Sequence, residues 1–189
     1  MYKKQMTLQR VTSYLLLAAS ALVFIYSLGL MTDLYDVLYL YTDKYYYVEG
    51  ADVYLNMQPF NRSLTGWGIA LIISAVSFFV FNTHSRRKYY VANYLTIGVN
   101  TALNVGVSAW ALTKVFSYKA DFLNVDFVHL KEMSEMYGTV YSESTFWFDI
   151  SAYVFGFLLI VTALSLFNLL FKLFVMNAER RALKISARR

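Results

Sequence analysis

The sequence predicts an all-α, polytopic membrane protein with four transmembrane helices. Hydrophobic residues make up 58% of the 189 residues and charged residues only 15%, so a water-soluble fold of this size would have too few polar side chains to cover its surface. Four segments without a charged residue are each long enough to cross a hydrocarbon core as a helix. Their apolar runs are continuous, whereas the strands of a membrane barrel alternate apolar and polar positions.

The four predicted helices cover about residues 11–32, 63–85, 89–113 and 150–175 of a single domain, 1–189. Two long loops, residues 33–62 and 114–149, connect the helices in pairs, and a basic tail covers residues 176–189. Apolar residues follow helical spacing in both loops, so we expect a short amphipathic helix in each. In the second loop these residues are Leu123, Phe127, Leu130 and Tyr137.

The positions of lysine and arginine predict the orientation. The N-terminus, the short loop between the second and third helices and the C-terminal flank, which includes Lys172, hold most of the 17 basic residues and one of the 12 acidic residues. Because basic residues stay on the cytoplasmic side, both termini are predicted to be cytoplasmic and the two long loops extracellular. The positive net charge then reflects topology, and no nucleic-acid partner is expected.

The third predicted helix has two distinct faces. One face has small residues at a spacing of four, which allows close approach of another helix; they are Gly98, Ala102 and Gly106. The same pattern occurs in the second helix (Gly66, Ala70, Ser74) and in the fourth (Ala152, Gly156). The opposite face is polar and comprises Asn93, Asn100, Asn104 and Ser108. Small residues and amides both support contacts between helices in lipid, either within the chain or with a partner.

A polar stripe on one helix also fits a conduit for neutral solutes. A conduit should recruit polar residues from several helices, and the first, second and fourth helices contribute almost none at depth. No charged residue occurs within the uncharged runs 11–32, 63–85, 89–113 and 150–171, and Pro59, the one proline, falls outside them. This pattern disfavours an ion-coupled pump or a transporter with broken helices.

No catalytic, metal or cofactor chemistry is expected. The chain has no cysteine and none of the common nucleotide-binding, zinc-protease or serine-hydrolase motifs. His129 and Glu132 lie one helical turn apart, but two ligands are too few for a zinc site. The absence of cysteine, together with abundant Lys, Tyr and Asn, is typical of a bacterial plasma membrane protein.

Two surfaces outside the membrane have distinctive compositions. The first loop is rich in tyrosine, which suits docking of an extracellular protein, although an interfacial aromatic belt or stacking on a sugar or small ligand would use the same residues. The candidate docking residues are Tyr39, Tyr41, Tyr45, Tyr46, Tyr47 and Tyr54. In the tail, Arg180, Lys184 and Arg188 share a helical face and are predicted to bind anionic lipid headgroups, with an acidic cytoplasmic subunit as the alternative.

The hypothesis that best fits these features is a non-catalytic tetraspan accessory or scaffold subunit. It would belong to a larger membrane complex, for which a bacterial ATP-driven transporter is one candidate, and would contact other integral membrane subunits. The alternative function is a small oligomeric channel or carrier for neutral solutes, lined by the third helix.

Overall fold

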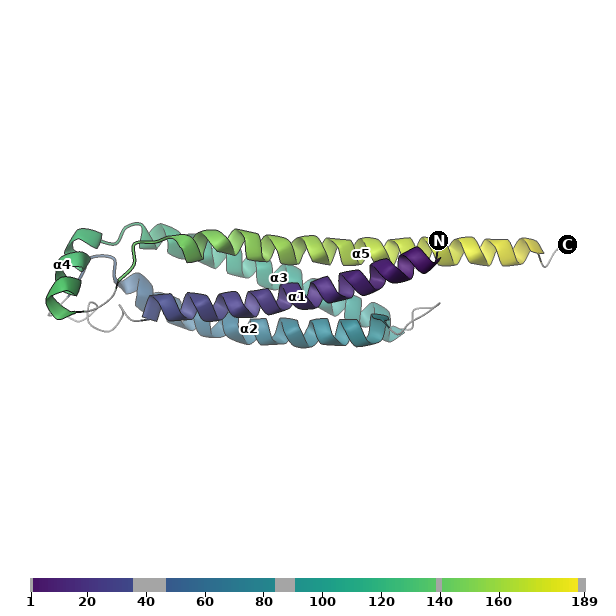
Figure 1. The fold of residues 1–189 in the computed structure, drawn as a ribbon, viewed down its shortest axis with the longest axis horizontal. Helices are drawn as coiled ribbons and strands as arrows, with labels where there is room; N and C mark the ends of the chain where they lie inside the picture. The colour runs from purple at the N-terminus through teal and green to yellow at the C-terminus, as the bar shows by residue number, and fades with distance from the viewer. Residues whose placement is uncertain (1, 36–46, 84–90, 139–140, 187–189) are drawn as a thin grey trace. The chain divides into compact units, whose positions relative to one another are not determined.

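The computed structural model describes residues 2–35, 47–83, 91–138 and 141–186, and the described chain is all-helical. Its five helices, in chain order in Figure 1, are α1 (Tyr2–Tyr35), α2 (Asp52–Thr83), α3 (Val91–Phe122), α4 (Phe127–Tyr137) and α5 (Phe146–Ser186). All but α4 are long and apolar enough to cross a membrane. The prediction of an all-helical chain with four helices long and apolar enough to span a membrane is therefore confirmed.

The helix boundaries differ from the uncharged gaps. α2 begins at Asp52 and runs through Pro59, so residues 52–62 belong to a helix and not to the first loop. Pro59, which falls outside the predicted span 63–85, therefore lies inside a long helix. α3 likewise continues to Phe122, and α5 continues to Ser186. Charged residues end a predicted transmembrane segment but do not end the helix, because arginine, lysine and glutamate are good helix formers.

Contacts divide the chain into two compact units. Unit 1 comprises Met1–Ala21, Ala70–Gly106 and Phe157–Arg189, and unit 2 comprises Leu22–Ile69 and Val107–Gly156. Each of the four long helices contributes one part to each unit.

The core of unit 2 is aromatic. Phe122, near the end of α3, is 1% exposed and has ring neighbours from three other helices. Its centroid lies 6.0 Å from that of Tyr54 on α2, 5.1 Å from that of Phe127 on α4 and 5.1 Å from that of Phe148 on α5. Aromatic pairs at these separations contribute packing area and favourable edge-to-face geometry. This cluster joins α2, α3, α4 and α5 in unit 2.

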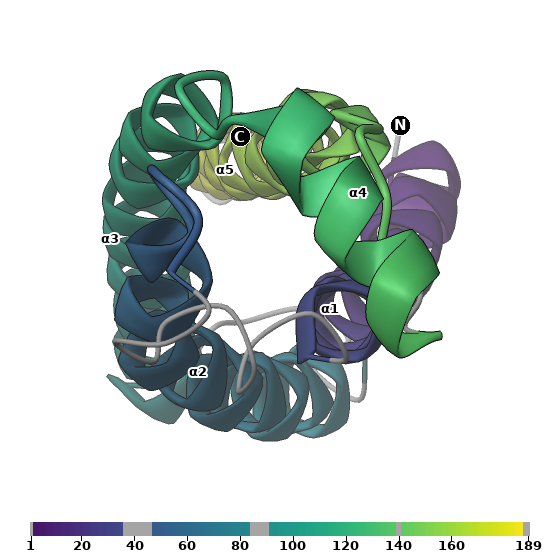
Figure 2. The ribbon, with the colours of Figure 1, turned by 90° about the vertical axis from the view of Figure 1, so that its left-hand side faces the viewer.

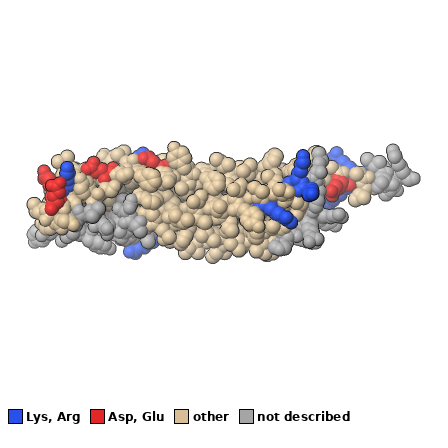
Figure 3. Space-filling view, viewed as in Figure 1, with Lys and Arg blue, Asp and Glu red and all other residues tan. Residues whose placement is uncertain are grey.

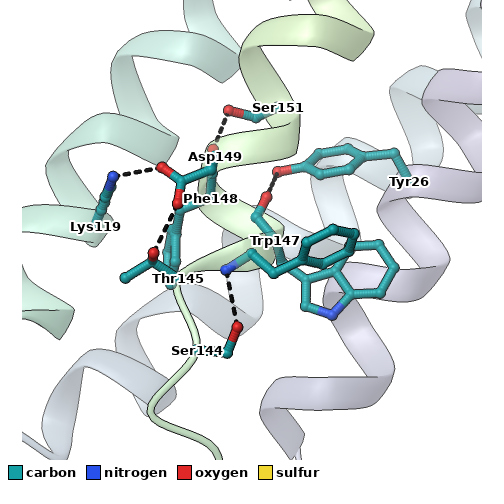
Figure 4. Close-up of polar contacts among 9 residues, drawn as sticks. Tyr26, Lys119, Ser144, Thr145, Trp147, Phe148, Asp149 and Ser151 are labelled. Carbon is teal, nitrogen blue, oxygen red and sulfur yellow. Dashed lines mark hydrogen bonds and ion pairs between the residues drawn. The ribbon is translucent and has the colours of Figure 1, made fainter.

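The start of α5 is fixed by polar contacts within unit 2 (Figure 4). The Thr145 carbonyl accepts from the backbone N–H groups of Phe148 and Asp149, both at 3.0 Å. The Asp149 carboxylate accepts from the Thr145 hydroxyl at 2.7 Å and pairs with the Lys119 ammonium of α3. These contacts satisfy backbone donors at the helix N-terminus and tie it to α3.

The short helix α4 lies in the segment where the sequence predicts an amphipathic helix, and Figures 1 and 2 show it beyond the ends of the long helices of unit 2. The Asp126 carboxylate accepts from the N–H of His129 at 3.0 Å and caps its start. Its buried residues are Leu130 and Ser134. The predicted stripe is correct at Leu130 and wrong at Leu123 and Tyr137, which are exposed, because α4 begins only at Phe127.

A backbone contact connects the segments before α2 and after α3. The Asp126 N–H donates to the Glu49 carbonyl at 3.0 Å. Gly50, with φ of 80°, lies directly against this second segment, and a Cβ there would come within 2.9 Å of the Asn124 oxygen. Only glycine adopts this positive φ and approaches Asn124 this closely without strain, because it has no Cβ.

Charged side chains are unevenly placed on each unit. In the face shown in Figure 3, the acidic side chains of unit 2 gather at the end that holds α4, and the rest of that unit is largely uncharged. In unit 1 the exposed charges lie near the N-terminus and along the last part of α5. On this face each unit therefore presents a long apolar surface and a charged end, as expected of a protein in a bilayer.

Candidate functional site

The polar face of α3 forms hydrogen bonds with two other helices within unit 1. The Asn100 Nδ2 donates to the Ser74 Oγ of α2 at 3.0 Å. The Asn104 Nδ2 donates to the Asn100 Oδ1 at 3.1 Å and to the Thr162 Oγ1 of α5 at 2.8 Å. Asn100 is 2% exposed and Asn104 is fully buried. The structure therefore brings α2, α3 and α5 together through one chain of amides and hydroxyls.

The two ends of the predicted polar stripe have other surroundings. Asn93 is buried, and its Nδ2 donates to the Phe81 carbonyl of α2 in unit 1. Ser108 is fully buried and belongs to unit 2, and its hydroxyl has no partner within the described part of the chain. The four predicted residues are thus all buried, and a hydrogen bond joins Asn104 to Asn100.

A second polar cluster in unit 1 connects α1 to α5. The Gln5 Nε2 donates to the Gln9 Oε1 at 3.0 Å and to the Asn168 Oδ1 at 3.1 Å. The Lys172 Nζ donates to the same Gln9 oxygen at 3.2 Å. All four side chains are at least 98% buried. Burial of an ammonium group is costly unless hydrogen-bond acceptors surround it, so this cluster holds Lys172 in place.

These two clusters correct two expectations. Lys172 is not part of an exposed basic flank, because α5 turns it toward Gln9 in the interior of unit 1. The expectation that the other predicted spans contribute almost no polar residues at depth is wrong for the second and fourth, since Ser74 and Thr162 both bond to α3. Serine and threonine suit an apolar helix because they can bond to its own carbonyls, as Thr162 does to Leu158 at 2.8 Å.

The small-residue face of α3 lies beside a groove in unit 1. The groove has a volume of about 650 Å³ and lies between α3 and α5. Gly98, Ala102 and Gly106 line it together with Leu166 and Leu169 of α5. A methyl group at Gly98 or Gly106 would meet nothing within 4 Å beyond its own stretch of helix. These glycines therefore do not pack closely against another helix of the described chain.

The other predicted small-residue stripes are also open at their glycines. A methyl group added at Gly66 on α2 or at Gly156 on α5 would likewise meet nothing within 4 Å. Close approach occurs instead at Gly29 and Gly68, which the sequence pattern missed. A Cβ at Gly29 would lie 2.2 Å from the Trp147 ring, and a Cβ at Gly68 would lie 3.1 Å from the Phe24 Cα. Each of these glycines contacts one bulky residue of another helix. The spacing of residues along a single helix cannot predict such a contact.

The tyrosines of the predicted docking surface separate into three groups. Tyr39, Tyr41, Tyr45 and Tyr46 lie outside the described residues. Tyr47 is 47% exposed and donates to the Asp52 carboxylate at 3.1 Å; this hydrogen bond and the negative charge of Asp52 raise the pKa of Tyr47. Tyr54 is only 2% exposed, so its assignment as a docking residue is wrong, because α2 directs it into the aromatic core.

The predicted lipid-binding residues lie at the end of α5. Arg180 is on the exposed last turns of the helix. The Lys184 side chain and all of Arg188 lie outside what the structure describes. Within the described residues, no group of three or more His, Asp or Glu side chains is placed to hold a metal ion.

Comparisons with protein-family models, curated proteins and solved structures found no match to this chain. The candidate site therefore rests on its geometry alone. That geometry is an α3 helix whose polar face is hydrogen-bonded inside unit 1 and whose small-residue face lies along a groove.

Proposed function

We propose that this protein is a non-catalytic accessory or scaffold subunit of a larger membrane complex, and that the α3–α5 groove of unit 1 binds a transmembrane helix of a partner protein. The observation that carries the proposal is the open space over Gly98 and Gly106 along this groove. In lipid, apolar contact alone does not drive helix association, because lipid tails are equally apolar. Close approach over small residues does drive it, through packing of side chains onto exposed backbone.

The spacing along the groove suits a helical occupant. Gly98, Ala102 and Gly106 recur every fourth residue, so they form a continuous shallow surface along α3. Leu166 and Leu169 of α5 provide a raised apolar edge. A partner helix with bulky side chains facing the glycines would fill such a surface. Flexible acyl chains would fill it with a greater loss of conformational entropy.

The internal bonds of α3 support a docking role over a conduit. Asn100 and Asn104 bond to Ser74 and Thr162, so their amides serve to hold α3 against α2 and α5 within unit 1. A helix fixed in this way presents its opposite face in one orientation, which lowers the entropic cost of binding a partner.

The proposal includes a membrane orientation and two peripheral contacts. Both termini would be cytoplasmic in a bacterial plasma membrane, with α4 and the segments next to it outside. The acidic residues near α4 and the exposed basic Arg180 on α5 fit that arrangement. Arg180, with Lys184 and Arg188, would bind anionic lipid headgroups, and the tyrosine-rich segment before α2 would contact an extracellular protein.

Substitution of the groove glycines tests this function. Gly98→Leu and Gly106→Leu would fill the groove with side chains that the fold of unit 1 can accommodate, since both positions are open. We expect the partner that co-purifies with the wild-type chain in mild detergent to be lost from both variants, while the helical content stays unchanged. The measurement is affinity purification with mass spectrometry, alongside circular dichroism.

Gly66→Leu is the matched control, because Gly66 is equally open but lies on α2 in unit 2. It should retain the partner. Recovery of the wild-type chain only as a monomer in several detergents would contradict the proposal. Recovery as a homo-oligomer that the groove variants disrupt would assign the groove to a second copy of this chain, and would also contradict it.

A further inference from the structure

The interior face of α2 in unit 2 carries three polar side chains with buried atoms that have no partner among the residues that the structure describes. These atoms are the Tyr54 hydroxyl, the Gln58 Nε2 and the Asn61 Oδ1. Their side chains are 2%, 9% and 1% exposed. Residues 54, 58 and 61 follow the spacing of one helical face, so the three groups form a line along the inside of α2.

Ser108 on α3 is a fourth buried residue of unit 2 with an atom, its Oγ, that has no partner among the described residues. α2 and α3 run antiparallel here, because Tyr118 donates to the Asn56 carbonyl and Trp110 packs against Phe60, with ring centroids 5.1 Å apart. Ser108 therefore lies at about the level of Asn61.

These groups have complementary hydrogen-bonding chemistry. A phenol and a serine hydroxyl can each donate and accept, the Gln58 amide nitrogen donates, and the Asn61 amide oxygen accepts. Buried polar groups without a protein partner are uncommon in folded proteins, and most are satisfied by ordered water. Water is the smallest ligand that can donate and accept at once, so one molecule can serve two of these atoms.

We propose that unit 2 binds a short file of ordered water molecules along α2, from Tyr54 to Asn61 and Ser108. The waters satisfy the four orphaned groups and form part of the folded core. This site is separate from the α3–α5 groove, which lies in unit 1, so its occupancy does not depend on a partner helix.

Radiolytic hydroxyl-radical labelling of the purified full chain tests the proposal, because radicals formed from bound water modify the side chains beside it. Met57 lies on α2 between Tyr54 and Gln58 and is fully buried. After correction for intrinsic reactivity, we expect Met57 and Tyr54 to be labelled several-fold faster than Phe155, which is equally buried in unit 2. Labelling of Met57 at the rate of Phe155 would overturn the proposal.

A matched pair of tyrosines gives a second measurement. Tyr26 is also buried in unit 2, but its hydroxyl donates to the Trp147 carbonyl at 3.0 Å (Figure 4). Tyr54→Phe should slow the labelling of Met57 several-fold and lower the melting temperature, because the waters lose a partner. Tyr26→Phe should lower the melting temperature and leave Met57 labelling unchanged. A higher melting temperature for Tyr54→Phe would indicate a dry, unsatisfied hydroxyl and would also overturn the proposal.

Discussion

The interiors of the two units are held together by different chemistry. In unit 1, side chains of α1, α2, α3 and α5 are linked by hydrogen bonds between amides, hydroxyls and one lysine, such as Gln5 to Asn168 and Asn104 to Thr162. In unit 2, packed rings around Phe122 join α2, α3, α4 and α5. Four helices can therefore be packed in lipid either by directional bonds or by aromatic volume.

We expect the largest loss of stability when a substitution removes hydrogen bonds from the polar cluster between α1 and α5 in unit 1. Gln9→Leu removes the acceptor shared by Gln5 and Lys172, both of which are buried. A hydrogen bond to a charged group contributes about 2–3 kcal/mol, so we expect the free energy of unfolding to fall by about 3 kcal/mol. Reversible unfolding in mixed micelles measures this change.

Gln58→Leu is the control for that substitution. Gln58 is a buried glutamine of unit 2 whose Nε2 has no partner among the described residues and would bond only to water, so its replacement should cost less than that of Gln9. If the two variants lose the same free energy of unfolding, the hydrogen bonds of Gln9 in unit 1 contribute no more stability than a buried glutamine does in unit 2.

We expect the next largest loss of stability when a substitution disturbs the aromatic packing of unit 2. Gly29→Ala places a methyl group 2.2 Å from the Trp147 ring, which must shift from its position against Tyr26, 6.3 Å away between centroids. Overpacking of this kind costs about 1–3 kcal/mol, and we expect about 2 kcal/mol. The tryptophan fluorescence of the variant should also change.

Gly98→Ala in unit 1 provides the comparison, since a methyl group there meets nothing within 4 Å. It should leave both stability and fluorescence unchanged. A loss of stability as large as that of Gly29→Ala would mean that the α3 groove is occupied within the chain itself.

The smallest expected effect comes from the loss of one hydrogen bond between α3 and α5 in unit 1. Asn104→Leu removes the bonds to Asn100 and Thr162 and should lower the free energy of unfolding by about 1 kcal/mol, the usual value of such bonds in membrane proteins. A double-mutant cycle with Thr162→Val isolates the bond between the two helices. If α3 instead lines a conduit, Asn104→Leu would abolish solute flux in liposomes and leave stability unchanged.

The helical class and the four apolar spans could be predicted from the sequence because they depend on composition and on the length of uncharged runs. The small-residue face of Gly98, Ala102 and Gly106 could likewise be recognised, because it depends only on spacing along one helix. Helix ends were less predictable: α2 begins at Asp52 although charged and aromatic residues occur there. A charged residue marks the end of an apolar span. The helix itself ends only where its backbone hydrogen bonds stop.

The tertiary structure decided which neighbour each side chain meets. It placed Tyr54 in the core of unit 2, brought Lys172 to Gln9, and put Trp147 against Gly29 while leaving Gly98 open. Each of these outcomes depends on the rotation of one helix relative to another. Along a helix that is apolar on all sides, the sequence contains little periodic signal to specify that rotation, so the contacts between helices specify it.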